Sequence, residues 1–288
     1  MTARVAVSFE FFPPKTDEGE SSLWNAIRAL EGLAPQFVSV TYGAGGSARD
    51  RTVRLTERIA LETTLRPMGH LTCVGSSVEE LRSVIGAYAA AGVGKILALR
   101  GDPPRDSNQP GAVDEKWRSH RGGLKHAVEL VELVRSLSDF EVGVAAFPEG
   151  HPESYDFAQD IEVLVKKQQA GASFAVTQIF FHVRDYVRLV ESANRAGVTM
   201  PIIPGVMPIT NVSQIKRFAE LSGADFPNDL ASRFEQVADD EAKVVRLGVE
   251  VATAFCKELQ AVGAPALHFY TLNRSTSARE VYQALQSS

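Results

Sequence analysis

The chain has 288 residues, of which 44% are apolar and 23% are charged, as is ordinary for a globular protein. Its formal net charge of −5, with no long run of one sign, argues against nucleic acid or a membrane surface as a partner. The chain has no apolar stretch as long as a membrane span, no signal-peptide core and no Cys-x-x-Cys pair around Cys73 or Cys256, so we expect a cytoplasmic protein with reduced thiols and no bound metal.

Short β-branched and aromatic runs alternate along the chain with longer amphipathic segments. Eight such runs predict strands, at residues 4–12, 36–43, 68–75, 95–101, 141–148, 173–181, 201–208 and 266–273. Apolar residues at helical spacing predict helices between them, for example over 21–33, 123–137 and 159–171. The last of these ends on a glycine, which is a common helix stop.

Eight strand–helix units in one chain predict an α/β fold with a parallel sheet, the (β/α)8 TIM barrel, as a single catalytic domain over residues 1–288. An open doubly wound sheet is the alternative, because its strands are also buried on both faces. Residues 102–122 are expected to form a long polar loop. Residues 222–240 are expected to form extra short helices between strands 7 and 8.

Polar residues gather at the predicted carboxyl ends of the strands, where barrel enzymes carry their chemistry. These residues are Glu10, Thr41, Tyr42, His70, Arg100, Gly101, Asp102, Glu149, His151, Ser154, Thr177, Gln178, Tyr270, Asn273 and Arg274. One such residue would indicate only a loop-anchoring hydrogen bond. Seven strands with this feature indicate a lined pocket.

Two short motifs partly match known binding motifs, one for dinucleotides and one for metals, but lack the context that those motifs require. The segment "GAGGSA" (43–48) fits the permissive dinucleotide pattern Gly-x-Gly-x-x-Gly/Ala, but it follows the second strand and not the first. A tight turn that lets a flat group approach the backbone is the preferred interpretation. The segment "EGHPE" (149–153) lacks helical His-x-x-x-His spacing, and Pro152 prevents a regular helix there, so a metal site is not expected.

The stretch "AVSFEFFPP" (6–14) places Glu10 among phenylalanines on a strand that is predicted to be buried. An unpaired buried carboxylate is costly, so its pKa rises or a partner is present.

The motifs "SFEFFPPK", "VSVTYGAGG", "HLTC", "ALRGDPP", "FPEGHPES", "TQIFF", "IIPGVMPI" and "HFYTLNR" occur between about residues 5 and 274. Together and in this order they resemble the methylenetetrahydrofolate reductase family in its bacterial type, which has the catalytic domain only. The resemblance implies a barrel that binds FAD without a Rossmann fold. It also implies NADH or NADPH as electron donor, a ping-pong reduction of 5,10-methylenetetrahydrofolate to 5-methyltetrahydrofolate, a role in one-carbon and methionine metabolism, and a homo-oligomer.

The resemblance also implies roles for single residues. Glu10 and Asp102 are the expected catalytic residues. Glu10, between Phe9, Phe11 and Phe12, is expected to be kept protonated by an apolar wall, so that it can donate a proton to the folate. The expected substrate contacts are Glu10, Thr41, Asp102, Gln178, Gln214, Phe218 and Arg274.

The expected FAD contacts are Thr41, Tyr42, Ala44, His70, Arg100, Gly101, Asp102, His126, Ala127, Phe147, His151, Ser154, Asp160, Lys166 and Lys167. Arg100 and Lys167 are the cationic candidates for the pyrophosphate. The sequence departs from the family pattern at five positions: His126 and Phe147 replace tyrosines, Ser154 an alanine, Val163 an asparagine and Lys166 an arginine.

Two other functions remain open at this point. One is a different FAD-binding barrel oxidoreductase, which would not need an acid on the first strand. The other is a folate-binding barrel without catalysis.

Overall fold

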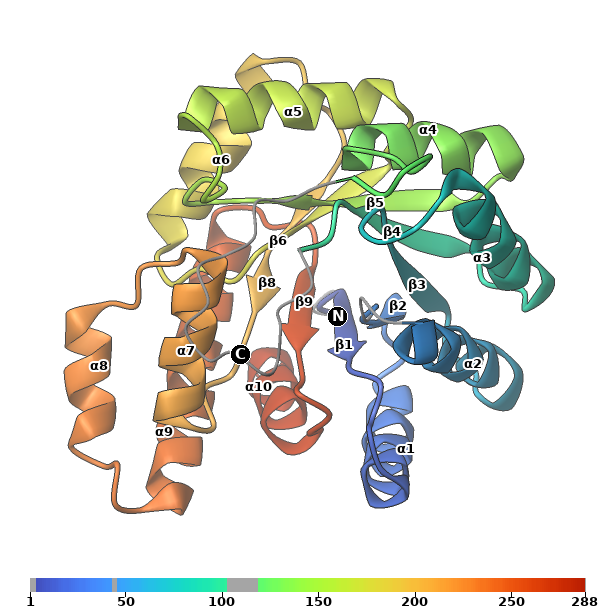
Figure 1. Cartoon of the computed structure of the whole chain (residues 1–288). Helices are drawn as coiled ribbons and strands as arrows, with labels where there is room; N and C mark the ends of the chain where they lie inside the picture. Colours follow the sequence, from blue (N-terminus) through green and yellow to red (C-terminus); the bar gives the residue numbers. More distant parts are fainter. Residues whose placement is uncertain (1–3, 43–45, 103–118, 288) are drawn as a thin grey trace.

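The computed structural model describes residues 4–42, 46–102 and 119–287. Its strands form one parallel sheet in the order β7-β6-β5-β4-β3-β2-β1-β9-β8 (Figure 1). They are β1 (Val7–Phe11), β2 (Phe37–Val40), β3 (Pro67–Thr72), β4 (Lys95–Leu99), β5 (Glu141–Ala146), β6 (Phe174–Thr177), β7 (Ile202–Ile203), β8 (Gly205–Val206) and β9 (Leu267–Tyr270).

The short strands β7 and β8 are two halves of the predicted seventh strand, separated by Pro204. Proline has no backbone N–H to donate to a neighbouring strand. At this point the pairing changes: β7 is paired with β6, and β8 is paired with β9. Since the two ends of the sheet are consecutive pieces of chain, the sheet closes on itself. The predicted TIM barrel is therefore confirmed.

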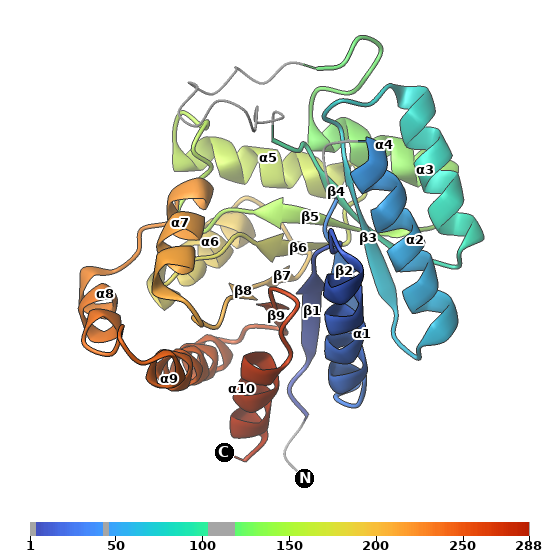
Figure 2. The ribbon, with the colours of Figure 1, turned by 60° about the horizontal axis from the view of Figure 1, so that its bottom comes forward.

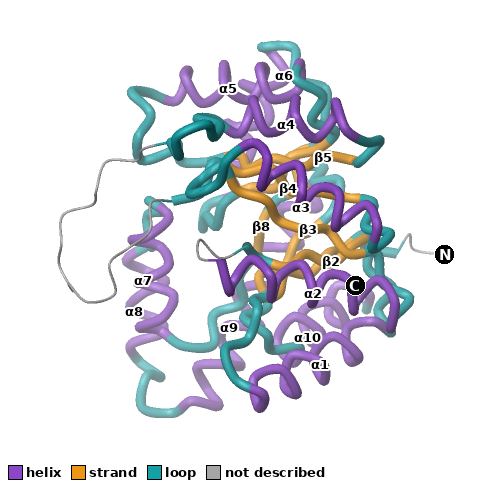
Figure 3. The backbone as a smooth tube through the Cα atoms, turned by 45° about the vertical axis from the view of Figure 1, so that its right-hand side comes forward, coloured by secondary structure: helices purple, strands orange, loops and turns teal. Residues whose placement is uncertain are grey.

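Helices surround the strands on the outside (Figures 1 and 3). They are α1 (Asp17–Glu31), α2 (Gly46–Glu62), α3 (Val78–Ala90), α4 (Ala127–Leu137), α5 (Phe157–Gln169), α6 (Val183–Arg195), α7 (Val212–Ser222), α8 (Asn228–Glu235), α9 (Glu241–Ala261) and α10 (Thr276–Gln286). The predicted helices over 21–33, 123–137 and 159–171 correspond to α1, α4 and α5. Within 222–240 the short helix α8 lies between α7 and α9.

Side chains of the strands alternate between two apolar layers. On β1, Phe9 and Phe11 belong to the large cluster between the barrel and its helices. A second cluster fills the interior of the barrel: Phe37, Met68, Leu97, Phe174, Val176, Ile203 and Ala266. This interior plug is apolar, so polar side chains of the same strands lie nearer to the carboxyl ends, as is usual for the fold.

The segment after β8 forms its own apolar cluster of Ile209, Ile215, Leu230, Phe234 and Val244, which joins α7, α8 and α9 (Figure 2). The fit is closest at Gly248 of α9, where a Cβ atom would lie 1.8 Å from the carbonyl oxygen of Ile209. Glycine at this position lets α9 approach the backbone that leads into α7, which fixes the start of α7 at the rim of the barrel.

No helix in the described ranges is long and apolar enough to cross a membrane. Cys73 and Cys256 are both free and buried.

Candidate active site

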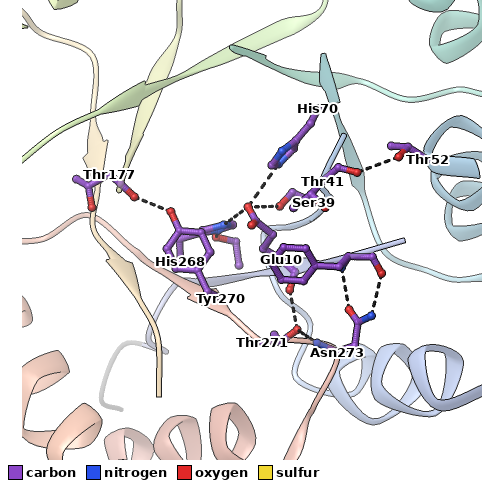
Figure 4. A network of polar contacts seen from close by, with 12 residues as sticks. Glu10, Ser39, Thr41, Thr52, His70, Thr177, His268, Tyr270, Thr271 and Asn273 are labelled. Carbon is purple, nitrogen blue, oxygen red and sulfur yellow. Dashed lines mark hydrogen bonds and ion pairs between the residues drawn. The ribbon is translucent and has the colours of Figure 1, made fainter. Parts of the chain in front are cut away.

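Glu10 lies in the interior of the barrel, and only 6% of the residue is exposed. Its Oε2 atom lies 3.4 Å from each of three polar atoms: Ser39 Oγ, His70 Nε2 and His268 Nε2 (Figure 4). These side chains come from β1, β2, β3 and β9, which are adjacent in the sheet. We call these four residues the Glu10 cluster.

His268 extends the Glu10 cluster in two directions. Its Nδ1 lies 2.7 Å from Ser8 Oγ, and its ring stacks on Phe37 of the interior plug with centroids 5.8 Å apart. Tyr270 meets the same ring edge-on and donates its hydroxyl to the carbonyl of Thr177 at 2.6 Å. His268 was not among the predicted site residues. The signal that could have identified it is its spacing from Tyr270, because residues i and i+2 of a strand share one face.

The expected apolar wall around Glu10 is wrong. Phe9 and Phe11 alternate with Glu10 along β1, and they therefore face the helices while Glu10 faces the interior. Burial opposes ionisation of the carboxyl group, but the hydrogen bond with His268, the charges of His70 and His268, and the Ser39 hydroxyl outweigh it and lower the pKa of Glu10. These contacts therefore favour the ionised form of the carboxyl group. Burial also lowers the pKa of His70, which favours the neutral imidazole.

Backbone contacts fix the Glu10 cluster against the turn after β9. Thr271 Oγ1 donates to the carbonyl of Glu10 at 2.6 Å. The side-chain amide of Asn273 bonds both the N–H and the carbonyl of Phe12, each at 2.8 Å (Figure 4). Leu272 and Asn273 have φ angles of 50° and 59°, in the left-handed region that non-glycine residues rarely occupy. These hydrogen bonds of Thr271 and Asn273 therefore hold a strained turn next to the carboxyl end of β1, and Arg274 follows directly after it.

The loop from β5 to α5, residues 147–156, is ordered around Asp160. One carboxylate oxygen of Asp160 accepts from the backbone of His151 at 2.9 Å, and the other accepts from Ser154 Oγ at 2.7 Å. The rings of Phe147 and His151 meet edge to face at 4.7 Å. His151, Ser154 and Asp160 line a hollow of about 290 Å³. The structure thus brings together four of the predicted FAD contacts.

Two predicted cationic contacts have protein partners. Arg100 forms a two-pronged ion pair with Glu153, of which the contact of Nη2 with Oε1 measures 3.0 Å. Lys167 is buried and donates to the carbonyl of Ala145 at 2.8 Å. Burial lowers the pKa of Lys167 to about 8, against the opposing charge of Asp160. Both residues lie within electrostatic reach of His151, whose pKa is lowered mainly by burial and next by Arg100.

The turn after β4 combines a tightly packed glycine with a buried hydroxyl that has no hydrogen-bond partner among the described residues. Gly101 has a φ angle of 82°, and a Cβ atom there would lie 2.5 Å from Val74 Cγ1 and 2.9 Å from Thr72 Cβ. The hydroxyl of Thr72 is buried and has no hydrogen-bond partner among the described residues. A buried hydroxyl without a partner is costly unless a ligand satisfies it. The residues present therefore fit a cofactor such as FAD.

The remaining predicted residues differ in exposure. Asp102, His126, Lys166, Gln214 and Arg274 are exposed, whereas Thr41, Tyr42, Gln178 and Phe218 are half-buried and Ala127 is buried at the start of α4. Gln214 and Phe218 both lie on α7. The carbonyl of Thr41 accepts from Thr52 Oγ1 at 2.9 Å. Ala44 lies outside the described residues.

Solved structures show a similar fold. An uncharacterized protein from Clostridium thermocellum that binds two copies of 5-methyl-5,6,7,8-tetrahydrofolic acid matches with a TM-score of 0.66 and 14% identity, over 99% of this chain and 95% of that chain. Dihydropteroate synthase from Xanthomonas albilineans matches with a TM-score of 0.51 and 19% identity, over 99% of this chain and 94% of that chain.

Sequence comparisons are more specific. The chain is 39% identical to 5,10-methylenetetrahydrofolate reductase of Escherichia coli K12 over 282 residues, which are 98% of this chain and 91% of that one. It is 33% identical to methylenetetrahydrofolate reductase (NADH) 1 of Zea mays, over 96% of this chain and 47% of that one. The family model for methylenetetrahydrofolate reductase matches residues 1–286. These matches, which agree with the barrel fold described above, show that the chain belongs to the methylenetetrahydrofolate reductase family.

Proposed function

We propose that the protein reduces 5,10-methylenetetrahydrofolate to 5-methyltetrahydrofolate, with bound FAD and with NADH or NADPH as electron donor. Family membership supports the reaction class. The observation that carries the mechanism is the buried Glu10 cluster inside the barrel, because a proton donor near the carboxyl ends of the strands is what this reduction requires.

FAD, when bound, would supply the group that accepts a hydride from the nicotinamide nucleotide and passes it to the folate, so that the two substrates use one site in turn. The binding site for FAD would be formed by the turn at Gly101, the Thr72 hydroxyl and the loop over residues 147–156. Arg100 is suited to the pyrophosphate because its planar guanidinium can bind two phosphate oxygens at once. Its ion pair with Glu153 is exposed at one end and therefore weak enough to be exchanged.

The folate needs a proton before it can accept a hydride. Its methylene group bridges two nitrogens in a five-membered ring, and protonation of the leaving nitrogen opens that ring to an iminium cation. Glu10 is the proposed donor. Since the contacts of Glu10 favour its ionised form, Glu10 must take up a proton before it can donate one. The imidazoles of His70 and His268, whose Nε2 atoms each lie 3.4 Å from Oε2 of Glu10, are the adjacent groups that could pass it on.

The side chain of Asp102 follows Gly101 at the mouth of the barrel and is exposed. Its negative charge would favour the cationic iminium, and its oxygens can accept hydrogen bonds from the pterin ring. Gln178, whose amide offers both a donor and an acceptor, and Thr41 are proposed contacts of the ring. Gln214 and Phe218 on α7, with Arg274, are proposed contacts of the outer part of the folate or of the nicotinamide nucleotide.

The electron donor is open between NADH and NADPH. The maize relative and an Arabidopsis thaliana relative, at 34% identity, are named as NADH enzymes, and this chain spans 47% of the length of each. We also predict that the protein is cytoplasmic and a homo-oligomer. Sedimentation analysis of the purified protein would test the oligomeric state.

The experiment that tests the proposed function is anaerobic spectroscopy of the purified protein. We expect a yellow protein that NADH or NADPH bleaches and that 5,10-methylenetetrahydrofolate then returns to yellow. A protein that binds folate but carries no flavin would instead be a binding barrel without this catalysis. A flavin that NADH or NADPH bleaches, but that the folate does not reoxidise, would indicate a different barrel oxidoreductase.

A further inference from the structure

The loop from β5 to α5 contacts the connection between α7 and α8 at two points. Glu149 Oε1 accepts a hydrogen bond from the backbone N–H of Asp225 at 3.1 Å. Gly223, the C-cap of α7, lies against Pro152: a Cβ atom at Gly223 would stand 2.7 Å from Pro152 Cγ. Gly223 also has a φ angle of 73°, which favours glycine. These two contacts connect segments that are more than 70 residues apart in sequence.

The second contact point sits at the far end of α7 from its N-cap. At its beginning the helix is fixed by the Asn211 side chain, which accepts from the backbone of Gln214 at 2.9 Å, and by the close approach of α9 at Gly248. An 11-residue helix is only marginally stable by itself, so its position depends on contacts at both ends. The contact with the β5–α5 loop therefore determines where the outer end of α7 lies.

The environment of Glu149 is unfavourable for a residue with a purely structural role. The side chain is half-buried, and its Oε2 atom is buried with no hydrogen-bond partner within the described part of the chain. Burial, with the nearby carboxylates of Asp185 and Asp225, raises the pKa of Glu149, against the opposing charge of His182 and the hydrogen bond from Asp225. Because this environment destabilises the carboxylate of Glu149, a role in positioning other residues explains Glu149 better than a role in stability.

The same loop carries the proposed cofactor contacts. Glu149, His151, Ser154 and Asp160 line the hollow of about 290 Å³ together with Gly223 from α7. The end of α7 thus forms part of the wall of the site that the β5–α5 loop builds. Figure 2 shows α7 next to the loop that leads into α5.

We propose that Glu149 is a positioning residue which, through the backbone of Asp225, holds the outer end of α7 against the β5–α5 loop and so places Phe218, in the outer half of α7, for the folate. This inference rests on the proposed function for the role of Phe218. Glu149 itself touches neither the reacting atoms nor the folate.

The test uses three variants of the full-length protein with its bound cofactor. Glu149→Ala removes the acceptor, Glu149→Gln keeps an amide oxygen that can accept from Asp225, and Glu220→Ala is the control, an exposed acid on α7 itself. The first readout is hydrogen exchange of residues 223–226. Loss of one hydrogen bond to a carboxylate should speed exchange there about tenfold in Glu149→Ala, with wild-type exchange in Glu149→Gln and in the control.

The second readout is steady-state kinetics. We expect the KM for 5,10-methylenetetrahydrofolate to rise about five- to tenfold in Glu149→Ala while kcat changes less than twofold, with Glu149→Gln close to wild type. Wild-type exchange in Glu149→Ala would overturn the proposal, and so would a kcat loss without a change in KM or a Glu149→Gln variant as impaired as Glu149→Ala. If the wild-type protein does not turn over the folate at all, the proposed function fails, and hydrogen exchange alone decides whether Glu149 holds α7.

Discussion

Removing the hydroxyl of Thr72 should raise the stability of the FAD-free protein but lower the affinity for FAD. Its hydroxyl is buried and has no partner among the described residues. Leaving a buried hydroxyl without a hydrogen bond costs about 1–3 kcal/mol. Thr72→Val keeps the shape of the side chain and removes that cost, so the protein freed of FAD should become more stable by about 1–2 kcal/mol.

The size of the effect in a melting experiment follows from the chain length. A protein of 288 residues has an unfolding entropy of roughly 0.6 kcal/mol/K near its midpoint. The stabilisation therefore corresponds to a rise in Tm of about 2–3 °C for the FAD-free protein. In contrast, the affinity for FAD should fall about fivefold, because the hydroxyl would have become a hydrogen-bond partner of the cofactor.

The assays are differential scanning fluorimetry of the FAD-free protein and titration by quenching of flavin fluorescence. Thr177→Val is the matched control, because the hydroxyl of Thr177 accepts from the backbone of Gly205 at 2.9 Å. That variant leaves a buried N–H without a partner and should lower Tm. A lower Tm for FAD-free Thr72→Val, or an unchanged affinity for FAD, would refute the reasoning about the Thr72 hydroxyl.

Three further predictions concern packing, cysteine reactivity and pH. Gly248→Ala places a Cβ atom against the carbonyl of Ile209 and should lower the free energy of unfolding by about 1–3 kcal/mol. Gly86→Ala on α3, which has open space around it, is the control and should leave stability unchanged or raise it. Equal Tm values for the two variants would contradict the close approach of α9. Cys73, whose pKa burial raises to about 12, and Cys256 should not react with a thiol reagent at pH 8 until urea unfolds the chain, so rapid labelling of the native protein would argue against their burial. Because the pKa of Glu10 is lowered from its usual 4.5, ionisation of Glu10 stabilises the fold above that pH, and this stabilisation is lost as the pH falls through the lowered value. Glu10→Gln should therefore reduce the loss of stability that the wild type shows below pH 4.5, and an unchanged profile would contradict the lowered pKa.

The barrel could be predicted from the sequence because its signals are local. Apolar runs separated by amphipathic helices repeat eight times, and a parallel sheet buried on both faces needs that pattern. The break at Pro204 was the feature that the pattern did not resolve. Reading residues 201–208 as one strand missed that a proline in its middle changes which neighbour the chain pairs with.

The surroundings of Glu10 could not be predicted from neighbours in sequence. The prediction treated Phe9 and Phe11 as neighbours in space, although adjacent residues of a strand face opposite sides. The true neighbours, His70 and His268, are 60 and 258 residues away and meet Glu10 only when the barrel closes. The alternation rule applied to all eight strands would have placed Ser8, His268 and Tyr270 on the inner face with Glu10.

Other parts of the candidate site depend on contacts between loops. Nothing in "FPEGHPES" indicates that Asp160, in the first turn of α5, orders the loop. Nor does it indicate that Glu149 reaches Asp225, because that contact joins segments 76 residues apart. The motif resemblance pointed to His151, Ser154 and Asp160, which the structure brings together, whereas composition and spacing alone gave only a cluster of polar residues at a strand end.

The most direct test of the central claim is anaerobic stopped-flow measurement of the two half-reactions in Glu10→Gln. General acid catalysis contributes about 100- to 10,000-fold, so reoxidation by 5,10-methylenetetrahydrofolate should slow by that factor while bleaching by NADH or NADPH stays within about threefold of wild type. Equal slowing of both half-reactions, or an unchanged rate with the folate, would contradict the assignment of Glu10 and its histidine partners as the proton source.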